Sequence, residues 1–339
     1  MDIWSISAGV GVRHRGAIGR YSLKNMSFCV AVIGAGTIGR SFAWLFARSG
    51  YPVQVFDPRP DLAEVVTELQ AEVSADAAAH DMLASELGTI SLAESVETAV
   101  AGASFVQESG PEDPQAKPKL FAQIAAAAPK DAIFATSSST IPASLIARHL
   151  PPEVAARVIV GHPFNPPHLM PLVEVVPAPA TSSDTVERAL EFYRSCGREP
   201  VALNREVRGF VGNRLQNALM KEAISLVENG VISAPDLDSV MKNSLGLRWS
   251  AVGQFEAMHL GGGDKGIRGF MDHIGTSFAE IGELPLDLSE AGMADVYAQV
   301  EQAYGQTPSR AGAQTRDRAQ QAVLEARRQR DRHTPPPPQ

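Results

Sequence analysis

A histidine and a glutamate twelve residues apart are the side chains of this sequence best suited to proton transfer. His162 follows the apolar run Val158 to Val160, and Glu174 lies within a second apolar run, Leu172 to Val176. A carboxylate on such a strand is costly to bury unless it is paired. A histidine on the preceding strand would pair with it, fix the imidazole tautomer and stabilise the charged ring, as a base that takes a proton from an alcohol requires. For the pair alone, the alternative is a loop histidine and a glutamate on the solvated side of an edge strand.

A glycine-rich turn between an apolar strand and a helix predicts dinucleotide binding. The strand spans residues 28–33 and the helical pattern residues 40–49. Gly34 allows the tight turn, Gly36 lets a pyrophosphate approach the backbone, and Gly39 lets helix and strand pack closely. The phosphates would lie at the helix N-terminus. The expected cofactor-binding residues of this turn are Gly34, Gly36, Thr37, Ile38 and Gly39.

A carboxylate at the end of the next strand strengthens this prediction. The apolar run Val53 to Phe56 ends at Asp57, about 20 residues beyond the turn, where a carboxylate accepts hydrogen bonds from the adenosine ribose. Asp57 would repel a 2′-phosphate, so NAD is favoured over NADP, and the nearby Arg59 keeps NADP open as an alternative.

The composition describes an ordinary globular protein with small-molecule partners. The 339 residues are 44% hydrophobic and 20% charged, enough for two domains with proper cores. A net charge of −8 argues against a nucleic-acid or anionic-membrane partner. Cys29 and Cys196 have neither metal-ligand spacing nor a disulfide framework, so we expect no metal and a reducing, cytoplasmic location.

Alternating helical and apolar segments predict a doubly wound α/β sheet of the Rossmann type. The segments are a helix over 61–87, a strand over 104–106, a helix over 117–128 and a strand over 132–135. The last strand leads into a run of hydroxyl side chains, Thr136 to Thr140, at a strand end that faces the cofactor crevice. These hydroxyls could hold a substrate oxygen, although such a run taken alone indicates a turn.

The C-terminal part is helical almost throughout, with helices expected over 210–228 and 234–245. Asn213 in the first turn is a candidate functional residue, or else a solvated first-turn amide. We expect an extension at 1–25, an NAD-binding domain at 26–204, an all-α domain at 205–325 that closes the substrate cleft and forms a dimer face, and a basic, proline-rich tail at 326–339.

Five segments, in the same order along the chain, resemble the 3-hydroxyacyl-CoA dehydrogenase superfamily, including its branch of L-gulonate 3-dehydrogenase (lambda-crystallin) and carnitine dehydrogenase. The resemblance covers about residues 27 to 325. The segments are VAVIGAGTIG at 30–39, ESGPEDPQAKPKLF at 108–121, the serine run, GHPFNPPHLMPLVEVV at 161–176 and GFVGNRL at 209–215.

The resemblance implies a role for each matching residue. His162 would be the general acid/base and Glu174 its orienting carboxylate, while Asn213 and Ser139 would hold the reacting oxygen. Ser138 takes that place if the loop shifts by one residue. The implied reaction oxidises a secondary alcohol by hydride transfer to NAD while His162 takes the hydroxyl proton.

Three more matching residues are expected at the nicotinamide side of the cofactor: Glu112, Lys117 and Asn165. Lys117 by itself would be a charge on a helix surface. The resemblance also implies a homodimer.

The sequence departs from the hydroxyacyl-CoA enzymes near the expected cleft. The departures are Pro163 after the histidine, SSST in place of asparagine-threonine-serine-serine, an extra residue before Gly209, and Leu247-Arg248-Trp249 ahead of Gly253-Gln254-Phe255-Glu256. The last is most similar to the gulonate and carnitine branch. Substrate identity is therefore what the departures place in question.

Charge in the segment 58–89 favours a small free 3-hydroxy acid over its CoA thioester. The segment holds Arg59 against Asp61, Glu64, Glu68, Glu72, Asp76, Asp81 and Glu86. Such a surface is unfavourable for the polyanionic CoA nucleotide. Arg248 is a candidate carboxylate clamp, or else a surface or dimer-face charge. Trp249 or Phe255 could face the trimethylammonium of carnitine, although core aromatics are the simpler expectation.

Three functions remain open. The first is an NAD-dependent dehydrogenase of a small hydroxy acid. The second is a short-chain 3-hydroxyacyl-CoA dehydrogenase of fatty-acyl metabolism, with CoA held by residues such as Arg157, Lys221 or the basic tail. The third is a non-catalytic, crystallin-like NAD-binding protein, which would need none of His162, Glu174 and Asn213.

Overall fold

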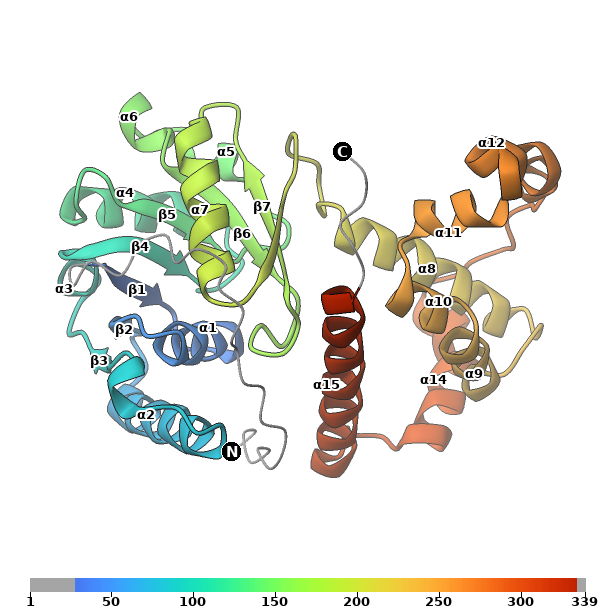
Figure 1. The fold of residues 1–339 in the computed structure, drawn as a ribbon, viewed down its shortest axis with the longest axis horizontal. Coiled ribbons are helices and arrows are strands. Elements are labelled where there is room, and N and C mark those ends of the chain that lie inside the picture. Colours follow the sequence, from blue (N-terminus) through green and yellow to red (C-terminus); the bar gives the residue numbers. More distant parts are fainter. Residues whose placement is uncertain (1–27, 334–339) are drawn as a thin grey trace. The chain divides into compact units, whose positions relative to one another are not determined.

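The computed structural model describes residues 28–333, and the chain forms two compact units that divide after Asn213 (Figure 1). The extension expected at 1–25 lies outside the described residues. The division falls later than the predicted boundary between 204 and 205. The reason is that Phe210 is buried in the core of the first unit and the backbone N–H groups of Val211 and Gly212 are bonded to its sheet.

The first unit is built on one eight-stranded sheet with the strand order β3-β2-β1-β4-β5-β6-β7-β8. Neighbours from β3 to β6 are parallel, β7 runs antiparallel to β6, and β8 is parallel to β7. The predicted Rossmann-type sheet is thus confirmed, with two further strands at one edge. The strands are β1 Cys29–Ile33, β2 Val53–Phe56, β3 Ile90–Leu92, β4 Ala103–Glu108, β5 Ile133–Thr136, β6 Val158–Pro163, β7 Leu172–Pro177 and β8 Glu199–Ala202.

Helices cover both faces of this sheet (Figure 1). One apolar core joins the sheet to α1, α2 and α7, and the other joins it to α3, α4, α5 and α6. Successive residues of β1 enter opposite cores, as the two-residue period of a strand requires. The helices are α1 Thr37–Arg48, α2 Leu62–Ala79, the 3-10 helix η1 Ala84–Glu86, α3 Val96–Val100, α4 Ala116–Ala127, α5 Ala143–Ala147, α6 Pro152–Ala155 and α7 Ser183–Ser195.

The helix predicted over 61–87 ends early. Asp81 adopts a left-handed backbone with φ 54°, and the Met82 N–H donates to the Ala77 carbonyl over 2.9 Å. This arrangement closes a helix, usually at a glycine, and an aspartate gives a weaker signal of it in the sequence. The short edge strands β3 and β8 were not predicted.

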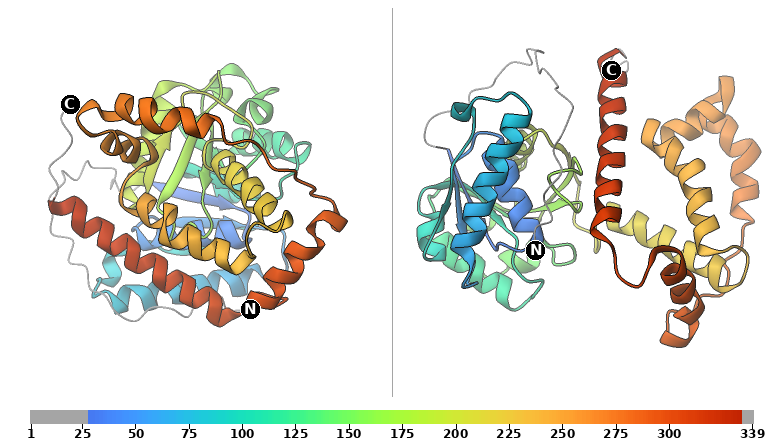
Figure 2. Two further views of the ribbon diagram at one scale, coloured as in Figure 1. Left: turned by 90° about the vertical axis from the view of Figure 1, so that its right-hand side faces the viewer. Right: turned by 90° about the horizontal axis from the view of Figure 1, so that it is seen from below.

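The second unit is helical, as predicted, and its buried core is small: Val227, Met293 and Val296, from α8 and α14. The helix expected over 234–245 ends at Asn243. Residues 326–333 of the predicted tail continue α15, the long red helix of Figure 2, and the rest of the tail lies outside the described residues. The helices are α8 Gly212–Glu228, which begins in the first unit, α9 Ala234–Asn243, α10 Leu245–Ala251, α11 Gln254–Gly261, η2 Gly263–Lys265, α12 Gly266–Phe270, η3 Met271–Gly275, α13 Thr276–Ala279, α14 Glu290–Tyr304 and α15 Arg310–His333.

Between residues 28 and 333, every helix is too short or too polar to cross a lipid bilayer.

Candidate active site

His162 and Glu174 face each other across two neighbouring strands. They are register partners in the antiparallel pair β6 and β7, both side chains are buried, and His162 Nδ1 lies 2.9 Å from Glu174 Oε2. An ionised carboxylate can only accept, so Nδ1 is the donor and Nε2 of the neutral ring remains an acceptor. Sequence and structure thus bring the two residues together, while their catalytic role stays a prediction.

The other oxygen of Glu174 is bound by backbone N–H groups. Val211 and Gly212, at the start of α8, donate to Oε1 over 3.0 and 2.9 Å. Burial raises the pKa of Glu174, but the hydrogen bonds from His162 and from the two N–H groups outweigh burial, and the pKa lies below its ordinary value. Glu174 is therefore held as a carboxylate beside the imidazole. Asn213 follows Gly212 directly, which brings its backbone to the same end of the helix.

Ser139 supplies a hydroxyl at the other ring nitrogen of His162. Its Oγ lies 3.1 Å from Nε2, so Ser139 and not Ser138 is the serine that meets the imidazole. Ser138 is buried, and its hydroxyl donates to Glu112 over 2.6 Å. A proton acceptor and a hydroxyl thus lie together at the strand ends, where a substrate alcohol could bind.

Glu112 is the anchor of the serine loop. Its Oε1 accepts from Ser138 Oγ and from the Ser139 N–H, and also from the N–H and the hydroxyl of Thr140, at 2.6 to 3.0 Å. Burial raises the pKa of Glu112, but these donors outweigh it and the pKa lies below its ordinary value. Glu112 therefore holds the loop that carries Ser139 in place through these four hydrogen bonds.

Lys117 is not the helix-surface charge that its sequence context indicated. It is 2% exposed, and its Nζ lies 2.7 Å from both carboxylate oxygens of Glu108, which is 1% exposed. Glu108 also accepts from Thr136 Oγ1 over 2.6 Å and from the Gly110 N–H over 2.7 Å. The pair thus ties the ends of β4 and β5 to α4. Its members lie only nine residues apart in the sequence, but their contact depends on the fold of the intervening turn.

A chain of buried polar side chains supports the same loop from behind, and no pattern in the sequence indicated it. Tyr193 donates to Gln107 over 2.7 Å, and Gln107 donates to Ser137 over 2.8 Å. Ser137 lies 2.8 Å from the Ser109 hydroxyl. Burial raises the pKa of Tyr193 well above its ordinary value, so its hydroxyl stays a donor.

The glycine turn has the geometry that a dinucleotide needs. Gly34 has φ 101°, a conformation that strains other residues, and a Cβ on Gly39 would lie 1.8 Å from the Gly34 oxygen. A Cβ on Gly36 would meet nothing within 4 Å, so the space before α1 is open to a phosphate. Thr37 and Ile38 begin the helix, whose first turn holds no acidic residue.

Asp57 is oriented towards this turn. Its Oδ2 accepts from the Ala35 N–H over 2.6 Å and its Oδ1 from the Arg59 N–H over 2.9 Å. A carboxylate has four lone-pair positions, so capacity remains for ribose hydroxyls. The Arg59 guanidinium binds Asp61 in a bidentate manner at 2.6 and 2.7 Å. This pairing weakens the case for Arg59 as a 2′-phosphate ligand.

Four other residues singled out in the sequence have exposed side chains. Asn165 is exposed just beyond β6, and Arg248 is exposed on α10 of the second unit. Trp249 and Phe255 are 39% and 74% exposed, so the expectation of core aromatics was wrong. Arg40 and Arg48 of α1 pair with Glu68 and Asp76, so the acidity counted along the segment 58–89 overstated the charge of this surface.

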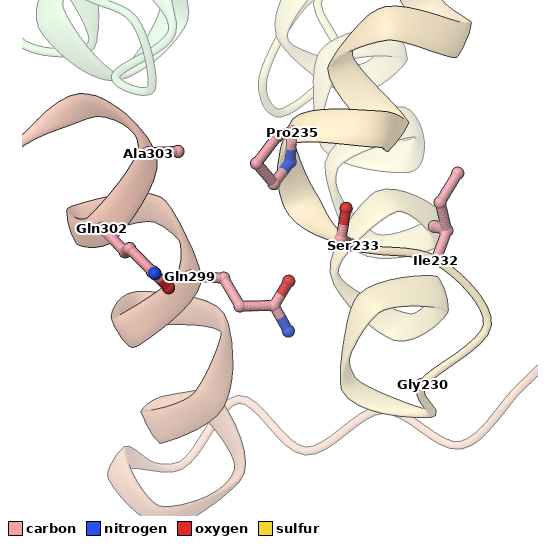
Figure 3. Close-up of a pocket in the computed structure, with 7 residues that line it drawn as sticks. All are labelled: Gly230, Ile232, Ser233, Pro235, Gln299, Gln302 and Ala303. Atoms are coloured by element: carbon pink, nitrogen blue, oxygen red, sulfur yellow. The ribbon is translucent and has the colours of Figure 1, made fainter.

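Two pockets differ in their relation to these residues. The larger, of about 580 Å³, lies in the second unit between the start of α9 and α14, where Gln299 reaches towards Ser233 (Figure 3). Its lining holds no ionisable side chain, so we place no chemistry there. The smaller, of about 260 Å³, lies next to the serine loop and is lined by Thr140, Pro142, Glu206, Val207 and Arg208.

Comparison with known proteins agrees with this geometry. Residues 29–207 match the family model for the NAD binding domain of 3-hydroxyacyl-CoA dehydrogenase, and residues 209–298 match the model for its C-terminal domain.

Three proteins with similar sequences are named for different functions. A Gibberella moniliformis 3-hydroxyacyl-CoA dehydrogenase is 40% identical over 72% of this chain and 76% of its own. A Mesorhizobium japonicum L-carnitine dehydrogenase is 38% identical over 72% and 67%, and a Bos taurus lambda-crystallin homolog is 40% identical over 74% and 79%.

A solved structure is similar over most of the chain. It is the 5-dehydrogenase of 5-formyl-3-hydroxy-2-methylpyridine 4-carboxylic acid, an NAD-dependent dismutase, with 26% identity, a TM-score of 0.74, and 88% of this chain and 98% of that one covered. The glycine turn, the strand order and both family models lead to one conclusion: this chain belongs to the 3-hydroxyacyl-CoA dehydrogenase family, NAD-dependent oxidoreductases that act on CH–OH groups.

Proposed function

We propose that this protein oxidises the hydroxyl of a small free L-3-hydroxy acid to the 3-oxo acid. The observation that carries the proposal is the environment of His162: Nδ1 lies 2.9 Å from Glu174 and Nε2 lies 3.1 Å from the Ser139 hydroxyl. A substrate hydroxyl that joins Ser139 at Nε2 would meet a proton acceptor whose tautomer is already fixed.

In the proposed reaction, His162 Nε2 takes the hydroxyl proton as the carbinol hydrogen leaves as hydride. Bound NAD supplies the hydride acceptor. The ring then carries two N–H groups and a positive charge, which the Glu174 carboxylate stabilises. Ser139 and Asn213 hold the oxygen as its C–O bond becomes a carbonyl, and the reverse reaction returns the proton from His162.

The cofactor site would use residues at the carboxyl ends of the first strands. We assign the pyrophosphate to the turn from Gly34 to Gly39 and the adenosine ribose to Asp57. We assign Glu112 and Asn165 to the nicotinamide side. Lys117 would act from behind the site, through Glu108 and the Gly110 carbonyl, which lies 3.4 Å from its Nζ.

Charge near α2 still supports a free acid. Of the seven acidic residues counted there, Glu68, Asp76 and Asp61 each pair with an arginine. Glu64, Asp81 and Glu86 are exposed and leave the surface acidic, which is unfavourable for the CoA nucleotide. The relative named L-carnitine dehydrogenase and the dismutase of a pyridine carboxylic acid are named for free acids.

Oxidation of a 3-hydroxyacyl-CoA is the second candidate, and the name of the Gibberella relative favours it. The name of the bovine relative favours a crystallin-like role, which would leave the dyad without a purpose.

The carboxylate of the substrate has two candidate partners. Arg248 is the one that the sequence suggested. Arg208 lines the 260 Å³ pocket together with Thr140, the neighbour of Ser139. We propose that a short acid whose hydroxyl meets Ser139 extends towards this pocket, because the next residue, Thr140, lines it. Arginine offers a planar fork that suits a carboxylate.

The test is NADH formation by the purified protein with L-gulonate, L-carnitine, L-3-hydroxybutyrate and L-3-hydroxybutyryl-CoA. Turnover of free acids that is lost in His162→Ala and kept in His149→Ala, an exposed histidine, supports the proposal. Turnover of the thioester alone would overturn the substrate assignment, and no turnover would revive the crystallin-like role.

The carboxylate partner is tested with the best acid from that panel. Loss of Arg208 or of Arg248 to alanine should raise KM for the acid far more than KM for NAD. Arg205→Ala serves as a control, because Arg205 is exposed near Arg208 but does not line the pocket.

We also propose a homodimer formed through the second unit. Leu247, Phe255 and Leu260 are among its exposed apolar side chains, and its own buried core is small. A second copy would remove such surface from water. Analytical ultracentrifugation should give twice the chain mass, and a monomer at micromolar concentration would contradict this.

A further inference from the structure

The chain enters α8 through a turn that holds an unusual backbone. Gly209 has φ 78° and Phe210 has φ 49°, so two successive residues lie in the left-handed region. A bulky side chain rarely adopts this conformation, and it persists only where the surroundings enforce it. Such outliers gather at functional sites.

The side chain of Phe210 is held against the catalytic histidine. Phe210 is 1% exposed, and its ring centroid lies 5.3 Å from that of His162. A second ring, that of Phe164, lies 5.5 Å from the imidazole in an edge-on arrangement. The imidazole thus has aromatic neighbours both from its own strand end and from the turn before α8.

The backbone of the same turn binds the partner of that histidine. The N–H groups of Val211 and Gly212 both donate to Glu174 Oε1, which lies 37 and 38 residues earlier in the chain. Gly212 must be small, because a Cβ there would lie 2.1 Å from the Phe164 ring. One short segment therefore contacts both members of the dyad.

We propose that the left-handed turn 209–212 is the third element of the proton-transfer site, with Phe210 positioning the imidazole and two backbone N–H groups fixing the Glu174 carboxylate. This rests on the proposed function, since it assigns His162 and Glu174 the proton transfer. Among the described residues, His162 is the titratable group that acts on Glu174, and the segment contributes N–H dipoles and no ionised side chain. The turn thus sets the orientation and the charge of the carboxylate without competing for its proton.

If the turn acts in this way, activity depends on its backbone conformation more than on the side chains at positions 209 and 211. Glycine and asparagine tolerate the left-handed region, whereas β-branched residues do not. Gly209→Asn should therefore retain far more activity than Gly209→Val. Val211 is exposed, so Val211→Ala keeps the N–H, whereas Val211→Pro removes it.

The experiment measures kcat, the KM for NAD and the pH profile of kcat/KM for these four variants. In Val211→Pro and Gly209→Val, kcat should fall about 10- to 100-fold below the paired variant, with the KM for NAD within about twofold. The acidic limb of the profile should move to lower pH, because an imidazole whose carboxylate partner is no longer held in place loses the countercharge that stabilises its protonated form. Equal kcat and equal profiles within each pair would overturn the proposal.

A spectroscopic measurement separates this inference from the proposed function. If none of the panel substrates is oxidised, nitrogen NMR of the His162 ring still reports its tautomer. The Nδ1–H form should dominate in the natural protein and in Val211→Ala, and should lose its dominance in Val211→Pro. An unchanged tautomer in a folded Val211→Pro protein, with folding checked by NADH binding, would refute the role of the turn. If Val211→Pro does not fold, the Gly209 pair decides by the same measurement.

Discussion

Replacing Lys117 by methionine should destabilise the first unit more than most single substitutions, because the Glu108 carboxylate would stay buried without its countercharge. Both oxygens of Glu108 lie 2.7 Å from Lys117 Nζ, and the two side chains are 1% and 2% exposed. The carboxylate would keep its bonds from Thr136 Oγ1 and the Gly110 N–H, which are too few to offset its lost hydration. Breaking such a pair costs about 3–5 kcal/mol of unfolding free energy.

Removing the charge of the partner as well should recover most of that loss. In Lys117→Met with Glu108→Gln, the glutamine oxygen still accepts from Thr136, and no charge remains in the interior. A buried pair that is replaced by neutral groups of similar size is often close to neutral in stability. We therefore expect the double variant within about 1–2 kcal/mol of the natural protein, which makes the two single effects strongly non-additive.

Urea unfolding of the full chain measures these differences. Far-UV circular dichroism and the loss of NADH binding should be followed together, because the two units need not unfold at one midpoint. With a slope of about 2 kcal/mol per molar urea, a loss of 4 kcal/mol moves the midpoint by about 2 M. Lys119→Met is the control: Lys119 is exposed on the same helix and should change stability by less than about 0.5 kcal/mol. A Lys117→Met protein as stable as that control, or additive single effects, would refute the reasoning.

Three further predictions follow from the first unit. Ser139→Ala should lower kcat by about 10²-fold with little change in the KM for NAD, and steady-state kinetics that show a change in KM alone would contradict this. Folding lowers the pKa of Glu174, so the stability that this carboxylate contributes is present at neutral pH and is lost as the pH falls below about 5. In Glu174→Gln, the free energy of unfolding should therefore fall less steeply with decreasing pH than in the natural protein, and the same pH dependence in both proteins would contradict this. Gly39→Ala should abolish NADH binding in calorimetry, because its Cβ would lie 1.8 Å from the Gly34 oxygen, whereas Gly102→Ala, with nothing within 4 Å, should bind normally.

Much of the fold could be predicted from the sequence because the strands and helices depend on local patterns. The apolar strands and the glycine turn are encoded by neighbouring residues, and the predicted α4 differs from the observed Ala116–Ala127 by one residue at each end. Edge strand β8 was missed because Glu199–Ala202 is short and largely exposed, which removes the apolar signal. The helix was predicted too long, over 61–87, because its end depends on the left-handed conformation of Asp81, which has only a weak signal in the sequence.

The residue types of the candidate site could be predicted from the sequence, whereas several contacts between these residues could not. The sequence indicated His162 with Glu174, and the register of β6 and β7 does join them. It left Ser138 and Ser139 as alternatives, because a shift of one residue in a loop changes which hydroxyl faces the ring. The structure brings Ser139 to His162, while Glu112 binds Ser138.

The sequence by itself determined the family, the cofactor class and the pairing of His162 with Glu174, because these depend on residue types at fixed spacing within strands, turns and helices. Tertiary structure alone decided the partner of Lys117 and the backbone partners of Glu174. The sequence indicated Lys117 as a surface charge, but in the fold it forms a buried ion pair with Glu108. Glu174 accepts hydrogen bonds from two backbone N–H groups that lie 37 and 38 residues away in the chain. Hydrogen bonds between distant segments are set by how the elements pack, and no local pattern in the chain encodes that packing.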